Sequence, residues 1–272
     1  MKSPFLVLVL VLVAPPAGAD EPEPVSPRHV LGTLHGFPSM SDAGGRVIAD
    51  GELTQERAGD RLLVKIRWTF GDGRQAEERD EFQVDKTLVQ RLFSWVESRK
   101  GKELRRFEID FPAGTGVAIT HDEKGEAKRE ESKLDLPAGR CFTGYGTALA
   151  VSELSLGAGG DARITFVAFT PKPRSVTLKI SRDREERLSV AGRPVNTDRY
   201  VLHPEIPFPA NVFVHAQDAY LWFTHTRPAA LVRAEQNLVV KDDPRVVIDV
   251  TPRGPARTEK SGAGSVAGPS LD

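Results

Sequence analysis

The sequence predicts an all-β protein with minor α content, built as a single large curved antiparallel sheet or an open β-barrel. Many short stretches alternate between apolar and polar residues, and Gly, Pro, Asn or Asp separate most of them. Hydrophobic residues make up 39% of the 272 residues, which is enough for a packed core. The stretches continue without a linker across Pro137-Ala138-Gly139, so we expect a single β-rich domain over residues 30–251.

The N-terminus has the order of a secretory signal peptide over residues 1–19. Lys2 gives a positive start, residues 5–13 are apolar, and Ala17-Gly18-Ala19 resembles a cleavage site. The apolar run has about half of the ~20 residues that a membrane-spanning helix needs, so an anchor is disfavoured. We expect cleavage after Ala19, export to the periplasm or the medium, and no transmembrane segment in the mature chain.

Two segments flank the predicted domain. Residues 20–29 are acidic and rich in Pro, which predicts a flexible leader. Residues 252–272 are rich in Gly, Pro, Ser and Ala, which predicts a disordered tail.

The clearest predicted strand spans residues 62–70. Its even-numbered residues are all apolar, whereas Lys65, Arg67 and Thr69 point to the opposite face, and Gly71-Asp72-Gly73 predicts a turn. The stretch 106–111 alternates in the same way. Further short strands are expected at 117–120, 163–169, 176–180, 186–190, 199–202, 211–214, 219–223, 231–238 and 246–250.

Two segments fit more than one structure. Residues 86–99 fit a helical stripe, but they also fit a strand that pairs with residues 103–111 through a turn at Lys100-Gly101-Lys102. We favour the hairpin, because the partner strand is strong and the turn is charged and contains Gly. Residues 147–156 are a second candidate helix, which the pattern does not decide.

Charge and cysteine content exclude several classes of function. Lys and Arg number 37 against 38 Asp and Glu, so the chain does not attract a polyanion and nucleic-acid binding is disfavoured. A single cysteine, Cys141, forms no internal disulfide and builds no cysteine-based metal site, and we interpret it as a small buried residue.

No residue pattern indicates catalysis, a metal or another cofactor. The six histidines show no metal-ligand spacing, and no serine lies in a nucleophile motif. Acidic doublets such as Glu77-Glu78 and Asp80-Glu81 lie in charged runs, which predicts solvated strand faces and hairpin tips. We therefore expect no enzyme, no catalytic residue and no metal ligand.

Aromatic residues give the best indication of a ligand. Alternation in residues 219–223 places Tyr220 and Trp222 on one face, with Leu221 and Phe223 on the other. A strand with two apolar faces is either covered on both sides or lines a cavity. The candidate ligand-binding residues are Trp68, Tyr220, Trp222 and Phe223.

The layout from about Gly51 to Val250 resembles exported bacterial envelope proteins of the periplasmic lipoprotein-carrier type, LolA-like and LolB-like. The segments that carry the resemblance are LLVKIRWTF ending in GDG, LDLPAGRCFTGYG, AGRPVNTDRYVL, LWFTHTRPAALVRAE and VVIDV. The resemblance implies a concave sheet face that holds apolar groups such as acyl chains. It carries over no catalytic residue, and the expected mature start has no lipid-attachment Cys.

These observations favour a non-catalytic exported protein that binds a lipid or another hydrophobic or amphipathic ligand in a concave apolar cavity. Apolar burial drives such binding without a sequence motif. The alternative is a structural or interaction module of the bacterial cell envelope whose partner is an envelope protein. A carbohydrate-active hydrolase is the third hypothesis.

Overall fold

The computed structural model describes residues 22–29, 31–154, 156, 159–170, 172–205 and 217–250. These residues form sixteen strands, which belong to a single sheet, and one helix. The predicted fold class is confirmed, since the sheet is large, open and antiparallel but for one pair of strands. The expected signal peptide and tail, and the expected strand at 211–214, lie outside the described residues.

The first part of the chain forms one run of the sheet. Its strands are β1 (Leu34–Gly36), β2 (Ser39–Asp42), β3 (Val47–Ala58), β4 (Arg61–Phe70), β5 (Arg74–Val84), β6 (Leu88–Arg99), β7 (Lys102–Asp110), β8 (Thr115–His121) and β9 (Ala127–Lys133). From β2 to β9 each strand pairs with the next along the chain, and β1 pairs with β3. This run is therefore an antiparallel meander joined by short turns.

The second part contains the helix and the remaining strands. They are β10 (Cys141–Phe142), α1 (Tyr145–Glu153), β11 (Asp161–Thr170), β12 (Lys172–Val190), β13 (Arg193–Glu205), β14 (Ala219–Thr224), β15 (Leu231–Asn237) and β16 (Arg245–Asp249). β16 pairs with β2, which joins this run to the first. The continuous order from β10 through β16 and β2 to β9 confirms that one sheet crosses the composition break near Pro137.

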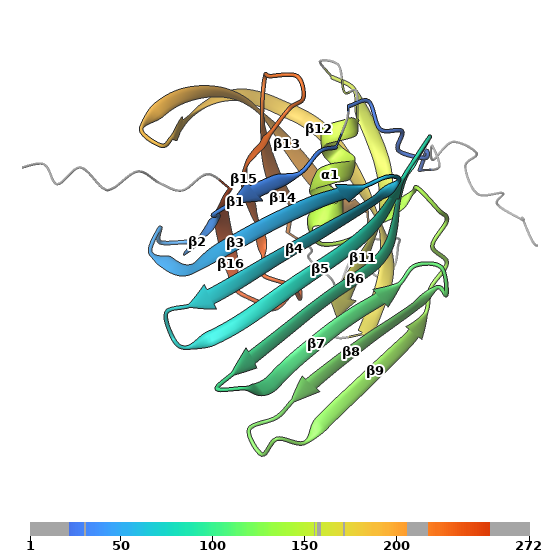
Figure 1. Ribbon diagram of the computed structural model, residues 1–272, viewed down its shortest axis with the longest axis vertical. Helices are drawn as coiled ribbons and strands as arrows, with labels where there is room; N and C mark the ends of the chain where they lie inside the picture. Colours follow the sequence, from blue (N-terminus) through green and yellow to red (C-terminus); the bar gives the residue numbers. More distant parts are fainter. Residues whose placement is uncertain are drawn as a thin grey trace, which may run out of the picture.

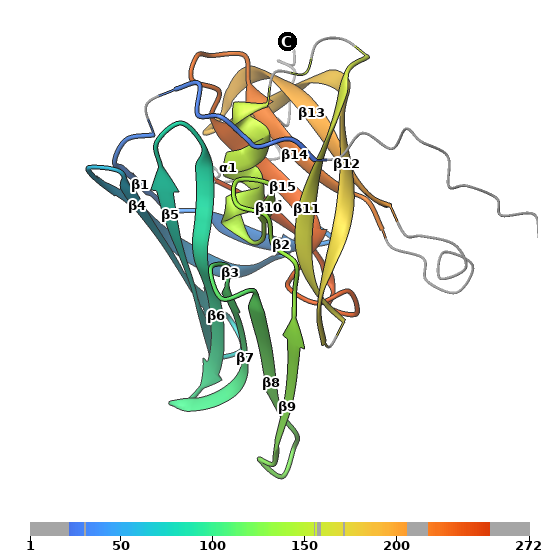
Figure 2. The same ribbon diagram turned by 90° about the vertical axis from the view of Figure 1, so that its right-hand side faces the viewer.

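The sheet curls until its two runs face each other, with α1 between them (Figures 1 and 2). β8 and β12 come into contact although no hydrogen-bonded ladder joins them. Gly116 on β8 makes this approach feasible, because an added Cβ there would lie 2.6 Å from Pro173 Cβ on β12. The curled sheet therefore closes by side-chain packing in this part and stays open between its edge strands, β9 and β10.

The ambiguous segment at 86–99 is a strand, as favoured. β6 pairs with β7 in antiparallel register, and the turn between them places Lys100 and Gly101 at φ 51° and 76°. Two adjacent residues with positive φ are typical of a tight hairpin turn that matches the twist of the flanking strands. The candidate helix at 147–156 is also present, and it begins and ends earlier than the pattern suggested, at Tyr145 and Glu153.

Two predicted short strands, at 176–180 and 186–190, are parts of one long strand, β12. The register shifts between Arg182 and Arg184, opposite β13, and the strand continues beyond this irregularity. The prediction of two strands was wrong because the polar residues between them are not a loop. Arg182 instead donates hydrogen bonds to Glu185 and to Asp198 on β13, which stabilises the outer half of this ribbon.

One large hydrophobic core fills the space between the two runs. Its largest fully buried side chains come from both runs, and they include Phe82, Phe107, Phe142, Met40 and Leu53. Cys141 is buried, as expected, and burial raises the pKa of its thiol to about 11.

Part of the predicted leader is fixed to the domain. Val25 is buried, its N–H donates to the carbonyl of Gly139, and its carbonyl accepts from the N–H of Leu88. These bonds tie residues 22–29 to the start of β6 and to the segment before β10. Of the described residues, none lies in a helix of the length and hydropathy that crossing a membrane requires.

Candidate functional site

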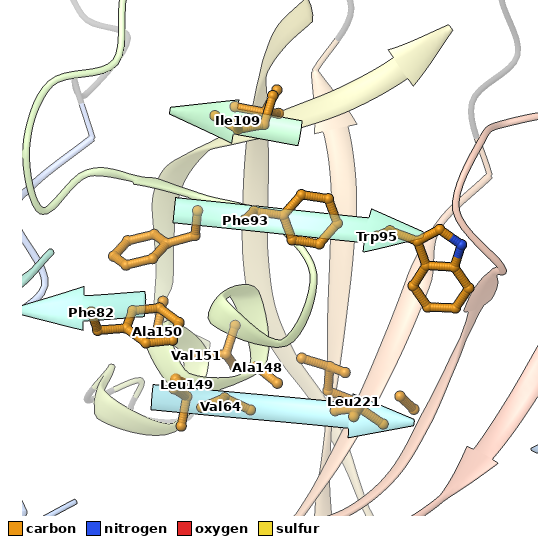
Figure 3. Packing of buried hydrophobic residues seen from close by; sticks show 14 of the residues in the cluster. Val64, Phe82, Phe93, Trp95, Ile109, Ala148, Leu149, Ala150, Val151 and Leu221 are labelled. Atoms are coloured by element: carbon orange, nitrogen blue, oxygen red, sulfur yellow. The ribbon is translucent and has the colours of Figure 1, made fainter. Parts of the chain in front are cut away.

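Helix α1 lies in the concave interior, against the inner face of the first run (Figures 2 and 3). The helix is short and built mainly of small residues, and Ala148, Ala150 and Val151 are buried in the main core. Small side chains let the helix backbone approach the sheet closely. The contacts that position its two ends therefore define the site.

The inner face of β5 presents two carboxyl groups below the start of α1. Glu78 and Asp80 are 8% and 1% exposed, and they lie between the buried residues Ala76 and Phe82 on the same face. The expectation that these acidic doublets lie on solvated faces was wrong for these two residues, whereas Glu81 is on the outer face with a half-exposed side chain. We refer to Glu78 and Asp80 as the carboxyl pair.

Glu78 caps the N-terminus of α1 from the sheet. Its Oε1 accepts a hydrogen bond of 2.7 Å from the N–H of Tyr145, one of the helix N–H groups that have no intrahelical acceptor. The residue before the helix, Gly144, has φ 53°, and an added Cβ there would lie 2.5 Å from the ring of Phe93. Only glycine lets the chain turn at this place and touch the sheet.

Gln90 on β6 joins the carboxyl pair to the segment before α1. Its Nε2 donates to Asp80 Oδ1 at 2.7 Å and to the carbonyl of Thr143, and its Oε1 accepts from the Thr143 N–H at 2.8 Å. The hydroxyl of Thr143 donates to the carbonyl of Val167 on β11. A buried polar network therefore connects β5, β6, β11 and the start of α1.

The carboxyl pair has apolar neighbours on both adjacent strands. Val64 and Phe93 lie opposite Asp80, and Ile66 and Trp95 lie opposite Glu78. Burial raises the pKa of both carboxyls, and it raises that of Asp80 furthest because the charge of its neighbour on the same strand adds to the effect. Two charges in this position are unfavourable, so the pair holds a proton more firmly than ordinary carboxyls do.

Two further buried polar atoms have no hydrogen-bond partner among the described residues. They are the indole N–H of Trp95 on β6 and the hydroxyl of Thr147 in the first turn of α1. A buried donor without an acceptor costs about 1–3 kcal/mol, so such groups usually bind water or a ligand. The packed interior thus contains polar groups whose hydrogen-bonding capacity is unused among the described residues.

The C-terminal end of α1 is held by the segment before β1. Glu153 is buried there and accepts a hydrogen bond of 2.5 Å from the N–H of Arg28, and His29 Nδ1 lies 3.5 Å from the same oxygen. Both ends of the helix are therefore attached to the domain through carboxylates, Glu78 at the start and Glu153 at the end.

An ion-pair network links the two runs of the sheet beside the core. Arg105 on β7 donates to Glu97 on β6 at 2.6 Å and to both oxygens of Asp243, at 2.8 and 3.0 Å, in the loop between β15 and β16. Glu97 also accepts from Arg74 on β5, and Asp243 accepts from the N–H groups of two residues in its own loop. We refer to Arg105, Glu97 and Asp243 as the ion-pair clasp.

The four predicted ligand-binding aromatics do not form one group. Trp68 on β4 and Phe223 on β14 are buried in the main core, whereas Trp222 packs with Leu188 and Val232 in a separate cluster, against which Tyr220 lies. The predicted alternation along β14 is confirmed, and both of its faces are covered. The binding role of these residues stays a prediction.

The second cluster is held by polar contacts as well. Trp222 Nε1 donates to Glu186 Oε2 at 3.0 Å, and the guanidinium of Arg199 lies 4.7 Å from the Tyr220 ring centre and 5.9 Å from that of Trp222. The indole N–H of Trp222 therefore has a partner, whereas that of Trp95 has none among the described residues.

Three potential metal ligands also come together where the residue after β14 meets the β12–β13 ribbon. Ligand atoms of Glu185, Asp198 and His225 lie within 4.8 Å of one another. Arg182 already donates to the two carboxylates, and His225 lies 2.9 Å from Asp198. The arrangement is explained by these ion pairs.

The outer face of β4 to β7 carries a shallow hollow of about 530 Å³. Most of its lining is polar or charged, and includes Arg67, Arg79, Arg106, Glu77 and Glu108. Arg67 and Arg79 both pair with Glu77, and Arg106 pairs with Glu108. This face differs sharply from the apolar interior behind it.

The carboxyl pair is the feature that sequence reasoning missed. A signal for it was present, because Ala76, Phe82 and Val84 share one parity and the two acids between them share it too. Alternation alone would have placed both acids on the apolar face. The doublets were instead assigned to solvated faces because they lie in a run of charged residues. Nothing in the sequence indicated Gln90 as their partner.

Comparisons with known proteins leave the family of the chain open. No family model and no curated protein matches the sequence. One solved structure that matches is the hypothetical lipoprotein YmcC from Escherichia coli (K12), with 13% identity and a TM-score of 0.37. The match covers 80% of this chain and 84% of that one. At this level of similarity it carries no argument about function, and the resemblance to lipoprotein carriers stays a prediction.

Proposed function

We propose that the chain is a non-catalytic, exported binding protein that holds a hydrophobic or amphipathic ligand, such as a lipid, in the interior beside α1. The observation that carries the proposal is two polar groups, Trp95 Nε1 and Thr147 Oγ1, that are buried among core residues and have no hydrogen-bond partner among the described residues. The polar atoms of an amphipathic molecule would supply a partner for such a group, and its chain would contact the apolar side chains around it.

The form of the sheet supports the same proposal. The sheet is open between β9 and β10, and the body between its two runs is a short helix of small residues. The signal-peptide pattern of residues 1–19 supports export.

The first experiment expresses the whole chain in a bacterial host, with export, and examines the purified protein by native mass spectrometry. Organic extraction then identifies any molecule that comes off. The proposal predicts a bound lipid or fatty acid, or a mass shift when fatty acids are added. A ligand-free mass that no fatty acid or phospholipid shifts would contradict it.

The three tryptophans of the chain locate the ligand. Trp68 and Trp95 lie in the main core, and Trp222 lies in the cluster on the other face of β14. Three variants keep one tryptophan each and carry Phe at the other two positions, and each is titrated with a brominated fatty acid, with the unbrominated acid as control. We expect quenching of Trp95 and Trp68 and little quenching of Trp222. Quenching confined to Trp222 would place the ligand outside the interior.

A second candidate is an interaction module of the cell envelope, and the hollow on the outer face of β4–β7 favours it. Alternating charges there, Arg67 and Arg79 beside Glu77, suit a protein surface of mixed charge. Chemical crosslinking in the exporting host, with Arg79→Glu as the variant, tests it. A partner crosslinked to the wild type and lost in Arg79→Glu would support this function.

A further inference from the structure

The carboxyl pair has fewer hydrogen-bond donors than two carboxylates require. Glu78 Oε1 receives the N–H of Tyr145, and Asp80 Oδ1 receives the side-chain amide of Gln90. The second oxygen of Asp80 is buried and has no donor among the described residues. A carboxylate oxygen in that position is costly, whereas a protonated one is itself a donor.

The carboxyl of Glu78 provides an acceptor for such a proton. The side chains of Glu78 and Asp80 lie two positions apart on the same buried face of β5, and each is a cause of the other's pKa shift. With a proton on Asp80 Oδ2, the pair carries one negative charge, and that charge faces the N-terminus of α1 through Glu78. A helix N-terminus stabilises one negative charge, and the apolar neighbours on β4 and β6 disfavour a second.

We propose that Glu78 and Asp80 share one proton, and that its loss leaves two negative charges in the apolar interior, so that the pair moves toward water and the Glu78–Tyr145 hydrogen bond that holds the start of α1 breaks. The pair then acts as a pH-sensitive latch within the interior. The proposal concerns the ligand-free chain, and it holds or fails independently of the proposed function.

Few other titratable groups face the pair, and the other acid that holds α1 is Glu153, beside His29 at the far end of the helix. From α1 the facing titratable group is the phenol of Tyr145, and burial, followed by the charges of Asp80 and Glu78, raises its pKa. The residues that face the pair from β4 and β6 are Val64, Ile66, Phe93 and Trp95, with Gln90 beside them. The phenol stays neutral across the range in which carboxyls titrate.

The sign of the effect follows from the raised pKa of the pair. The folded state keeps a proton that the released state gives up at an ordinary carboxyl pKa, near 4. The attachment of α1 to the sheet is therefore strongest below about pH 4, and it weakens as the pH rises toward the raised pKa of the pair. Each pH unit in that window makes release of the helix up to about tenfold easier, because one proton is lost on opening.

Amide hydrogen exchange followed by mass spectrometry tests the latch on the full chain from pH 4 to pH 8. Exchange of peptides that contain α1 is divided by the intrinsic rate at each pH. Three variants are compared with the wild type. Asp80→Asn mimics the protonated acid permanently, since its amide donates to Glu78 and its oxygen accepts from Gln90. Glu78→Gln likewise removes the shared proton, and Glu81→Gln alters a half-exposed acid on the outer face of the same strand.

The wild type and Glu81→Gln are expected to show α1 protection that falls with rising pH by up to about tenfold per unit. Asp80→Asn, or Glu78→Gln where Asp80→Asn does not fold, is expected to show protection that is level over the same range. Level protection in the wild type would overturn the proposal. So would a slope in Asp80→Asn equal to that of the wild type, because the proton would then lie elsewhere.

Discussion

Both faces of β5 carry carboxyl groups, and the two faces use them in opposite ways. On the outer face Glu77, whose side chain is 27% exposed, pairs with Lys65, Arg67 and Arg79 at N–O distances of 2.5–3.1 Å. On the inner face the carboxyl pair meets apolar side chains and the start of α1. Adjacent residues of one charged run thus belong to different environments, and the direction of the side chain decides what a carboxyl does.

The difference between the faces is energetic as well as geometric. Exposed ion pairs contribute about 0–1 kcal/mol each because water screens both partners. Buried polar groups contribute little when satisfied, but they cost several kcal/mol when a partner is removed. The same substitution should therefore have a large effect inside and a small one outside.

The largest effect is expected where α1 turns onto the inner face. Gly144→Ala combines a positive φ with an added Cβ 2.5 Å from the ring of Phe93, and we expect a loss of roughly 3–5 kcal/mol in the free energy of unfolding. Urea denaturation measures it. The control is Gly125→Ala in the β8–β9 turn, where φ is 84° and the added Cβ meets nothing within 4 Å. That variant should lose about 1 kcal/mol, and equal losses would show that contact with the sheet does not matter.

The ion-pair clasp should give the next largest effect. Arg105→Ala leaves Glu97 and Asp243 with their remaining donors only, and we expect a loss of about 2–3 kcal/mol in the free energy of unfolding. Arg79→Ala is the matched outer-face variant, since its side chain is 59% exposed. It should lose less than about 0.5 kcal/mol. Urea denaturation measures both variants. Similar losses in their free energy of unfolding would contradict the contrast between the faces.

A smaller effect is expected in the cluster around Trp222. Trp222→Phe keeps an aromatic ring but removes the N–H that donates to Glu186, so we expect a loss of about 1 kcal/mol. The matched interior variant is Trp95→Phe, whose lost N–H has no partner in the described residues. Thermal unfolding should show Trp95→Phe to be as stable as the wild type or more so. A larger loss in Trp95→Phe than in Trp222→Phe would indicate a hidden partner for that indole.

Sequence patterns predicted the sheet well because alternation reflects one buried face, and residues 62–70 are an example. They divided β12 into two strands because its middle is charged, and only the pairing with β13 shows that those charges are satisfied in a ribbon. The sequence patterns could not predict the role of the carboxyl pair. That role depends on Gly144 and Gln90, which are 66 and 12 residues from Glu78 in the chain. Such long-range contacts leave no local pattern.

The central claim is that a carboxyl on the inner face of β5 keeps its proton when the outer ones have lost theirs. Infrared spectroscopy of the carboxylic acid C=O stretch tests it directly at pH 6, about two units above the ordinary Asp pKa. The account predicts a protonated-acid band in the wild type and in Glu81→Gln, and its absence in Asp80→Asn. A wild-type spectrum without that band at pH 6, or the same band in Asp80→Asn, would contradict the account.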